Sequence, residues 1–273
     1  MNIAAGTTLA GALAQLPLDP LENRILLCHA TGATRVALVA HPERKLSEEE
    51  AQRLSALAAR RIAGEPIAYI TGEREFYGLD FHVNSAVLIP RPDTELLVEL
   101  AIERTPTRGR VLDMGTGSGA IAVSIAHSRP DAGVTALDVS EAALAVARGN
   151  AERHRARVRF LHSDWFAALA GEQFDIIVSN PPYIAAGDEH LAQGDLRFEP
   201  QGALTDRADG LSALRTIVEG APRHLVAGGW LLMEHGYDQA AQVRALLAAD
   251  YVEVQSWRDL AGIERVSGGR LRS

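Results

Sequence analysis

From Arg110 to the carboxyl end, short apolar runs alternate with longer amphipathic segments. The runs are rich in β-branched and aliphatic residues and are bounded by turn residues, which is typical of buried strands. The candidate strands are 111–112, 134–137, 158–161, 176–178 and 230–233, with 251–254 and 265–266 as a closing pair, and the clearest helices are 120–127, 141–154 and 211–225. This alternation predicts a parallel α/β sheet covered by helices on both faces, with right-handed crossovers.

Residues 1–75 have a different pattern, with apolar positions at helical spacing and Gly or Pro between the segments. Ser47 to Glu50 fits a capping box, in which Ser47 is the N-cap and Glu50 reaches back to it. Gly64 and Pro66 then end the helix that follows. We therefore expect a separate small helical bundle over 1–75, which either only packs or docks a partner.

Residues 76–90 alternate with a period of two, and Asn84-Ser85 offers a turn before a second apolar stretch. The simplest interpretation is a β-hairpin that links two domains. Pro90 and Pro92 end this pattern, and a helix is predicted to follow them. The expected organisation is thus a helical bundle at 1–75, a hairpin linker at 76–90 and a larger α/β domain at 91–273.

Composition narrows the class of protein. The chain has 273 residues and a formal net charge of −8, which speaks against nonspecific nucleic-acid binding. The single cysteine, Cys28, excludes an intrachain disulfide and fits a reducing compartment, so we expect a cytoplasmic location. No apolar run approaches the length of a membrane span, and the scattered histidines do not support a metal site.

A glycine-rich loop follows the first strand of the larger domain and opens the next helix. It comprises Gly115, Thr116, Gly117, Ser118 and Gly119, preceded by Asp113. Glycines permit a tight turn and let a ligand approach the backbone, and amides at a helix start point toward it. The loop favours a cofactor that contains adenosine, although a dinucleotide or a structural turn would use the same residues.

Polar or aromatic residues also follow the next two strands. Asp138 ends the second strand, where a carboxylate can accept hydrogen bonds from two ribose hydroxyls. A helix N-cap is the alternative role, but Ser140 is better placed for it. After the third strand, Trp165 could cover one face of an adenine, with Asp164 accepting from its amino group. A tryptophan packed in the core is an almost equal alternative.

The fourth strand ends in Ser179-Asn180-Pro181-Pro182-Tyr183. Two consecutive prolines fix the backbone and cannot donate hydrogen bonds. The Asn180 side-chain oxygen and the Pro181 carbonyl are then two rigid acceptors beside the flat ring of Tyr183. They suit a planar group with an NH2, such as an amide or a nucleobase. A simple turn at the end of the strand is the alternative.

Together the glycine loop, the acid after the second strand and Asn-Pro-Pro-Tyr resemble the Rossmann-like methyltransferases that use S-adenosylmethionine, and in particular those acting on amino or amide nitrogens. A dehydrogenase has no use for the Asn-Pro-Pro-Tyr element. The resemblance extends over the whole chain to the release factor glutamine N5-methyltransferases (HemK/PrmC family). It includes Ile89 to Glu95, Arg197 to Pro200 and Glu234-His235-Gly236.

The resemblance implies an enzyme of translation termination that methylates the glutamine of the Gly-Gly-Gln loop in peptide chain release factors. S-adenosylmethionine would be the cofactor and S-adenosylhomocysteine the product, and the sheet would have seven strands, the last one antiparallel. We expect a monomer that binds no nucleic acid directly. The residues that would contact the cofactor are Gly115, Thr116, Gly117, Ser118, Gly119, Asp138, Trp165 and Asn180.

By the same resemblance, Asn180, Pro181, Pro182 and Tyr183 would bind the substrate glutamine, with Asn180, Pro181 and Tyr183 taking part in catalysis. The long polar segment 184–209 has no clear period and is typical of a lid or a recognition surface. Two alternatives remain open. One is an amino methyltransferase acting on a nucleobase in DNA or RNA, and the other is a non-catalytic scaffold that binds the cofactor.

Overall fold

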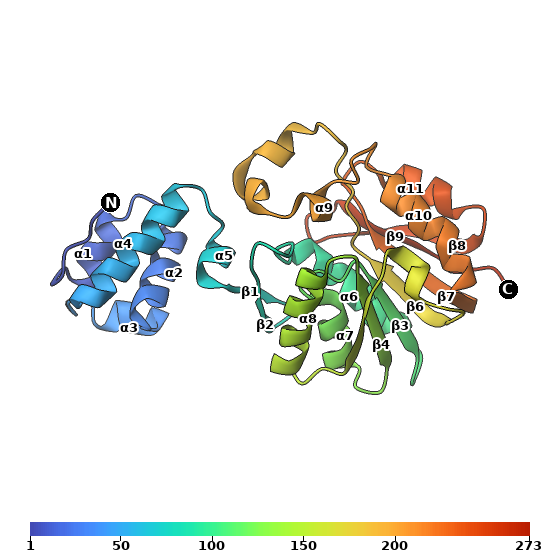
Figure 1. The fold of residues 1–273 in the computed structure, drawn as a ribbon, viewed down its shortest axis with the longest axis horizontal. Helices are drawn as coiled ribbons and strands as arrows, with labels where there is room; N and C mark the ends of the chain where they lie inside the picture. The colour runs from blue at the N-terminus through green and yellow to red at the C-terminus, as the bar shows by residue number, and fades with distance from the viewer. The chain divides into compact units, whose positions relative to one another are not determined.

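The computed structural model describes all residues from 1 to 273. The chain divides into two compact units, Met1–Gly72 and Glu73–Ser273. The first unit is helical, and the second contains every strand of the protein (Figure 1). None of the helices is both long enough and apolar enough to cross a membrane.

The first unit is a bundle of short helices. Its elements are α1 (Leu9–Gln15), α2 (Pro20–Thr31), α3 (Arg35–Ala40), α4 (Glu48–Ile62) and α5 (Ile67–Thr71). The capping box predicted at Ser47 is present, because the Ser47 hydroxyl accepts from the Glu50 N–H and the Glu50 carboxylate accepts from the Ser47 N–H. Leucines from α1, α2 and α4 fill the core of the bundle.

The second unit opens with a hairpin of β1 (Glu73–Phe76) and β2 (Leu79–His82). Its two strands are joined by a two-residue turn at Tyr77 and Gly78. Their φ angles of 53° and 73° are positive, as in the turns that usually close such hairpins. The turn predicted at Asn84-Ser85 is present, because the Asn84 carbonyl accepts from the Val87 N–H at 3.1 Å and Asn84 Oδ1 accepts from the Ala86 N–H at 2.9 Å. No strand follows it directly, so the turn of the hairpin itself lies earlier in the chain than the pattern predicted. The alternation read as one strand is two strands, and the turn lets both Phe76 and Phe81 reach the core.

The main sheet has seven strands in the order β5-β4-β3-β6-β7-β9-β8. They are β3 (Arg110–Met114), β4 (Gly133–Asp138), β5 (Val158–His162), β6 (Phe174–Ser179), β7 (Leu225–Glu234), β8 (Tyr251–Arg258) and β9 (Glu264–Leu271). The first five strands in this order pair in parallel, whereas β9 is antiparallel to both β7 and β8. The predicted α/β fold, with seven strands and an antiparallel last strand, is confirmed.

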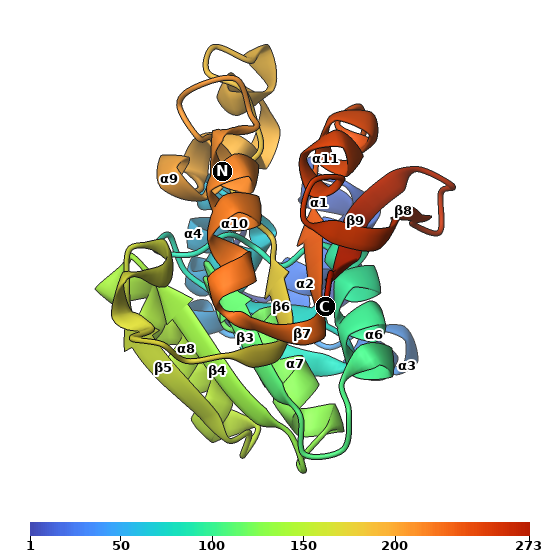
Figure 2. The same cartoon turned by 90° about the vertical axis from the view of Figure 1, so that its right-hand side faces the viewer.

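Helices cover both faces of this sheet (Figures 1 and 2). One face packs against α6 (Glu95–Arg104), α7 (Ala120–Ser128) and α8 (Glu141–Arg153). The other packs against α10 (Ser212–Gly220) and α11 (Ala240–Leu247). The remaining elements are short: η1 (Pro92–Thr94), η2 (Trp165–Ala168), η3 (Glu189–Ala192), η4 (Gly194–Phe198), α9 (Gln201–Leu204) and η5 (Ala221–Arg223).

The strand order reverses at β3, because the chain continues from β3 to β4 on one side and places β6 on the other. Ligands of open α/β sheets bind at such a switch point, outside the carboxyl ends of the strands. The glycine loop follows β3, and Asn-Pro-Pro-Tyr follows β6. The topology therefore places both motifs at the same edge of the sheet.

One fully buried side chain fastens the hairpin to the glycine loop. Asn150, on α8, accepts from the His82 N–H at 2.7 Å and donates to the His82 carbonyl at 3.0 Å. It also donates to the Ser118 carbonyl at 2.8 Å. Three elements far apart in the sequence thus meet at a single amide, and its position in the structure allows neither a charge nor an apolar replacement.

We predict that Asn150→Asp lowers the free energy of unfolding by about 3 kcal/mol, because a carboxylate would face two buried carbonyl acceptors with no donor of its own. Urea denaturation measures this change. The adjacent exposed Gly149, where an added Cβ would meet no atom within 4 Å, is the matched control. Gly149→Ala should raise stability by up to about 1 kcal/mol through helix propensity. Equal stability of Asn150→Asp and the wild type would contradict the role of Asn150.

Candidate active site

A cavity of about 270 Å³ lies at the carboxyl ends of the parallel strands. It brings together residues that the sequence analysis selected from four separate segments, namely Gly115, Gly117, Asp138, Asp164, Trp165, Asn180 and Pro182. Thr116, Ser118, Gly119, Pro181 and Tyr183 do not border it. No group of three or more His, Cys, Asp or Glu side chains in the structure could hold a metal ion.

The glycine loop offers close approach to the backbone but few free amides. Gly115 and Gly117 have φ angles of 71° and 55°, and no atom lies within 4 Å of where a Cβ would stand. The amides of Gly115 and Thr116 donate to the Leu137 carbonyl, and that of Gly117 donates to Asp138. A pyrophosphate needs such amides for itself. The loop therefore suits an uncharged or cationic ligand better than a dinucleotide.

The other loop residues face the protein interior. Thr116 donates to Asp113 Oδ2 at 2.6 Å, and Asp113 is fully buried. Burial raises the pKa of this carboxyl group to about 7, and its Oδ1 atom has no hydrogen-bond partner. Ser118 is buried, and Gly119, at the start of α7, lies so close to Ala147 of α8 that an added Cβ would be 3.1 Å from the Ala147 Cβ. These residues shape the loop. The sequence pattern alone cannot distinguish this structural role from contact with a ligand.

Asp138 both borders the cavity and supports the loop. Its Oδ2 accepts from Gly117 N–H and its Oδ1 from Ser140 N–H, each at 2.9 Å. Ser140, and not Asp138, caps the N-terminus of α8. Each carboxylate oxygen keeps a further lone pair, because a carboxylate can accept about four hydrogen bonds. The geometry thus leaves Asp138 able to accept from two adjacent hydroxyls.

Trp165 lies on the cavity wall in an unusual backbone conformation. Its φ angle is 45°, in a region that bulky residues rarely occupy. The Ser163 hydroxyl donates to the Trp165 carbonyl at 2.7 Å and helps to hold this conformation. Strained residues of this kind cluster at ligand sites. The sequence could suggest an aromatic residue at this point but gave no signal for its backbone conformation.

The two polar ends of Asn-Pro-Pro-Tyr are anchored by groups outside the motif. Asn180 Nδ2 donates to Thr94 Oγ1 at 3.2 Å, and the Tyr183 hydroxyl donates to Glu234 Oε1 at 3.2 Å. Pro181 is buried between these contacts. Sequence reasoning included Thr94 in the segment Ile89 to Glu95 of the family resemblance, but gave its side chain no role. It noted Glu234 as part of a family resemblance without a role for its side chain.

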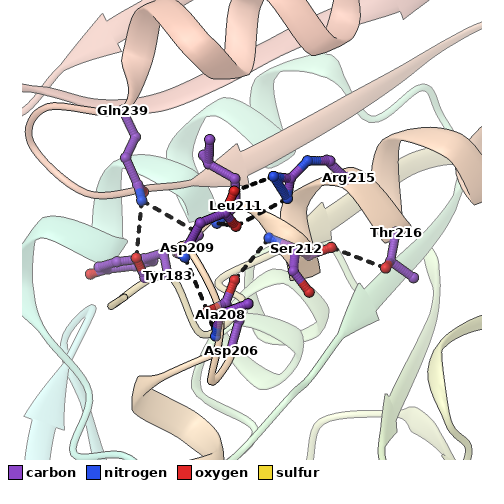
Figure 3. Close-up of polar contacts among 10 residues, drawn as sticks. Tyr183, Asp206, Ala208, Asp209, Leu211, Ser212, Arg215, Thr216 and Gln239 are labelled. Atoms are coloured by element: carbon purple, nitrogen blue, oxygen red, sulfur yellow. Dashed lines mark hydrogen bonds and ion pairs between the residues drawn. The ribbon is translucent and has the colours of Figure 1, made fainter. Parts of the chain in front are cut away.

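The backbone of Tyr183 is held as well, as Figure 3 shows. Gln239 Nε2 donates to the Tyr183 carbonyl at 3.0 Å and to the Gly210 carbonyl at 3.2 Å. The Asp206 carboxylate holds the turn that contains Gly210, because it accepts from the backbone N–H groups of Ala208, Gly210 and Ser212. Tyr183 is therefore fixed at both its hydroxyl and its carbonyl.

Glu234 is buried, with a relative exposure of 2%. Burial raises the pKa of its carboxyl group to about 7, and the charge of Asp93 adds to this rise. Hydrogen bonds from Thr94 and Tyr183 and the charge of Arg265 act in the opposite direction. Its Oε2 atom has no hydrogen-bond partner. A carboxylate that titrates near neutral pH thus lies directly behind the motif.

Two chain segments complete the cavity wall, and an ion pair joins them. Residues 86–88 come from the stretch after the hairpin, and Pro200, Gly202 and Ala203 come from the long connection after β6. The buried Glu199 carboxylate pairs with Arg91 and accepts from the Ile89 N–H at 3.1 Å. Part of the segment 184–209 thus belongs to the cavity wall.

The fold and this cavity define a Rossmann-like methyltransferase. The family described as "Methyltransferase small domain" matches residues 91–198. A crystal structure of a methyltransferase from Pyrococcus furiosus has the same fold, with a TM-score of 0.56 and 22% identity, over 80% of this chain and 99% of that one. A 16S rRNA methyltransferase of T. thermophilus, solved with AdoMet and guanosine, matches with a TM-score of 0.54 and 24% identity. The match covers 73% of this chain and 50% of that one.

The whole chain narrows the family further. The "PrmC N-terminal domain" matches residues 7–72. Relatives named release factor glutamine methyltransferase are 57% identical in Burkholderia pseudomallei, over 97% of this chain and 96% of the relative, and 57% in Bordetella pertussis, over 97% and 100%. The Escherichia coli relative is 47% identical, over 95% of this chain and 96% of the relative. The chain belongs to the release factor glutamine methyltransferases.

The raised pKa of Asp113 predicts a pH-dependent stability. The folded protein holds this proton more tightly than the unfolded chain, so the contribution is present at low pH and is lost as pH rises toward about 7. Asp113→Asn removes the titration. Between pH 5 and 7, the free energy of unfolding of the wild type should fall by at least about 1 kcal/mol relative to Asp113→Asn.

Urea denaturation at a series of pH values tests this difference. The control is Glu152→Gln on the exposed side of α8, which should follow the wild-type profile. Parallel profiles for the wild type and Asp113→Asn would show that the buried carboxyl group does not titrate in this range.

Proposed function

We propose that this protein transfers a methyl group from S-adenosylmethionine to the side-chain amide nitrogen (N5) of the glutamine in the Gly-Gly-Gln loop of peptide chain release factors. S-adenosylhomocysteine is the second product. The observation that carries the proposal is the meeting of Gly115, Gly117, Asp138 and Asn180 in one cavity. Relatives named for this activity match the chain over nearly its full length at 47–57% identity.

The residues around the cavity fit the cofactor. Asp138 would accept from the ribose hydroxyls, Trp165 would cover the adenine, and Gly115 and Gly117 would allow the ligand to touch the backbone. The scarcity of free amides in the loop also favours this ligand, which carries no phosphate. When bound, S-adenosylmethionine supplies an electrophilic methyl group on a sulfonium. We assign Thr116, Ser118 and Gly119 to the support of this loop.

Asn180 and Pro181 would prepare the acceptor. An amide nitrogen is a poor nucleophile because its lone pair is delocalised into the carbonyl. The Asn180 side-chain oxygen and the Pro181 carbonyl would accept the two N–H bonds of the glutamine amide, which fixes the direction of its nitrogen. Positioning of this kind can contribute about 7–11 kcal/mol, so no strong base is required. The nitrogen becomes acidic once it is alkylated, and its proton then leaves.

Tyr183 and Pro182 would close the substrate site. The ring of Tyr183 would lie against the flat amide and exclude water, and Pro182 already borders the cavity. The anchors at Glu234 and Gln239 support this role, because they restrict the ring and its backbone before any substrate arrives.

The bundle and the segment 184–209 would recognise the rest of the protein substrate. We place the docking function in residues 1–75, where α3 exposes two valines, Val36 and Val39, with relative exposures of 76% and 83%. The protein would act in the cytoplasm as a monomer. Methylation of a nucleobase is not supported by the names of the relatives that match the whole chain, and the net charge of −8 also disfavours it.

The first experiment combines the protein with labelled S-adenosylmethionine and a purified release factor, followed by peptide mass mapping. The wild type should add one methyl group to the glutamine that follows Gly-Gly. Asn180→Ala should lower kcat at least about a hundredfold, since it loses a hydrogen bond that orients the acceptor. Cofactor affinity, measured by calorimetry, should weaken only in part. A normal kcat for Asn180→Ala would remove Asn180 from the mechanism.

A second experiment tests the docking function of the bundle. The double substitution Val36→Glu, Val39→Glu should raise KM for the release factor about tenfold, because it places charge on an apolar contact surface. The kcat at saturation and the cofactor affinity should not change. Val252→Glu, an exposed valine of β8, serves as the matched control and should leave KM unaltered. Equal KM values for all three proteins would restrict the bundle to packing.

A further inference from the structure

A buried threonine connects the proposed acceptor-binding asparagine to a buried carboxylate. Thr94 has a relative exposure of 4% and accepts from Asn180 Nδ2 at 3.2 Å. Thr94 also neighbours Glu234, where a hydrogen bond from its side chain lowers the pKa of the Glu234 carboxyl group. The three residues come from η1, from the turn after β6 and from the end of β7. They form a continuous series of hydrogen bonds behind the cavity.

While Glu234 is ionised, the chemistry of these groups allows only one hydrogen-bond direction. A carboxylate can only accept, so the single hydroxyl proton of Thr94 must point to Glu234. Toward Asn180 the Thr94 oxygen is then an acceptor. Asn180 must present its NH2 group to Thr94, and its Oδ1 atom points the other way. Shape alone would not decide this, since the two ends of an amide are nearly the same size.

We propose that Thr94 and Glu234 are positioning residues that fix the amide orientation of Asn180, so that the site accepts a side chain with an NH2 group and rejects a carboxylate. The inference rests on the proposed function and deepens it, because it names how glutamine is told from glutamate. A glutamine amide donates to Asn180 Oδ1. A glutamate at the same place would bring a negative charge against that oxygen, with no proton to share.

The same carboxylate also fixes the aromatic wall of the site. The Tyr183 hydroxyl donates to Glu234 Oε1 at 3.2 Å. The buried Glu234 carboxylate therefore positions both Asn180, through Thr94, and the ring of Tyr183 in the proposed amide site. The charged groups that face Glu234 are Asp93 on η1 and Arg265 on β9. Arg265 is itself paired with Asp93 and Asp259, so its positive charge is shared among three carboxylates.

The test compares Thr94→Val, which has nearly the same shape but no hydroxyl, with Thr94→Ser, which keeps the hydroxyl. Thr94→Val should lower kcat/KM for the release factor about tenfold or more, because the Asn180 amide is free to turn over. Thr94→Ser should recover most of that loss. Affinity for S-adenosylmethionine should be the same in all three proteins, which also verifies that each is folded.

A binding measurement separates orientation from a general loss of packing. Calorimetry with S-adenosylhomocysteine present compares release factors that carry Gln, Glu or Ala after Gly-Gly. The wild type should bind the Gln form at least about tenfold more tightly than the Glu form. Thr94→Val should reduce this preference to about threefold or less, with unchanged affinity for the Ala form.

The pH profile provides an independent readout through Glu234. Protonation of Glu234 makes it a donor and releases Thr94 from its fixed direction. Wild-type kcat/KM should therefore rise with pH through about 7, the pKa of this carboxyl group. Glu234→Gln should lack this step and should share the reduced preference for Gln over Glu, since its side chain can donate to Thr94 at every pH.

Two failures are distinguishable. If the wild type does not methylate a release factor, the proposed function is wrong. If the wild type methylates it, but Thr94→Val and Glu234→Gln keep the full preference for Gln over Glu, the orientation of Asn180 does not depend on this series of hydrogen bonds. A loss of cofactor affinity equal to the loss of kcat/KM would also overturn the proposal.

Discussion

The parallel register of β3 with its two neighbours is the constraint on which the site depends. Met114, the last residue of β3, pairs with Leu137 of β4 and with Ser179 of β6. The residues that follow these positions, among them Asp138 and Asn180, therefore emerge at one level of the sheet. A slip of one residue would shift a strand by about 3.3 Å and turn its side chains to the other face. The proposed cofactor and substrate groups would then no longer meet.

Burial at this edge makes each polar group depend on a specific partner. Ser179 donates to the Met114 carbonyl at 2.8 Å and ties β6 to β3 just below the cavity. Asp113 and Glu234 are carboxyl groups removed from water, and each leaves one oxygen without a partner. An unpaired buried polar atom costs about 1–3 kcal/mol. Such a cost is typical of sites in which polarity is retained for function.

The sequence predicted the sheet well because its central strands β3, β4 and β6 are buried on both faces and therefore read as apolar runs. It misplaced the turn of the hairpin, because the sequence pattern does not predict the left-handed conformation of Tyr77. The backbone conformation of Trp165 was hidden for the same reason. Glycine spacing located the loop, but it did not reveal that Thr116 turns inward to Asp113.

The contacts that Thr94 and Glu234 make with the motif were beyond sequence reasoning, because both residues are remote from it along the chain. Thr94 lies 86 residues before Asn180, and Glu234 lies 51 residues after Tyr183. Neither spacing has a period, and neither residue type is distinctive. What makes them important is the direction of a proton between them, which depends on one group being a carboxylate. Such a property belongs to a set of atoms in space and is absent from any single segment.

The irregular stretch between the hairpin and α6 joins the two halves of the site. Residues 86–88 border the proposed cofactor cavity, while Thr94 holds the asparagine that would receive the substrate. Between them, the Ile89 N–H donates to Glu199 from the opposite wall. This stretch forms no strand, so its backbone and side-chain groups are available to three different partners. A strand here would have used these backbone groups for its own hydrogen bonds. The proposed cofactor cavity and the proposed substrate site would then have lost the segment that supports both.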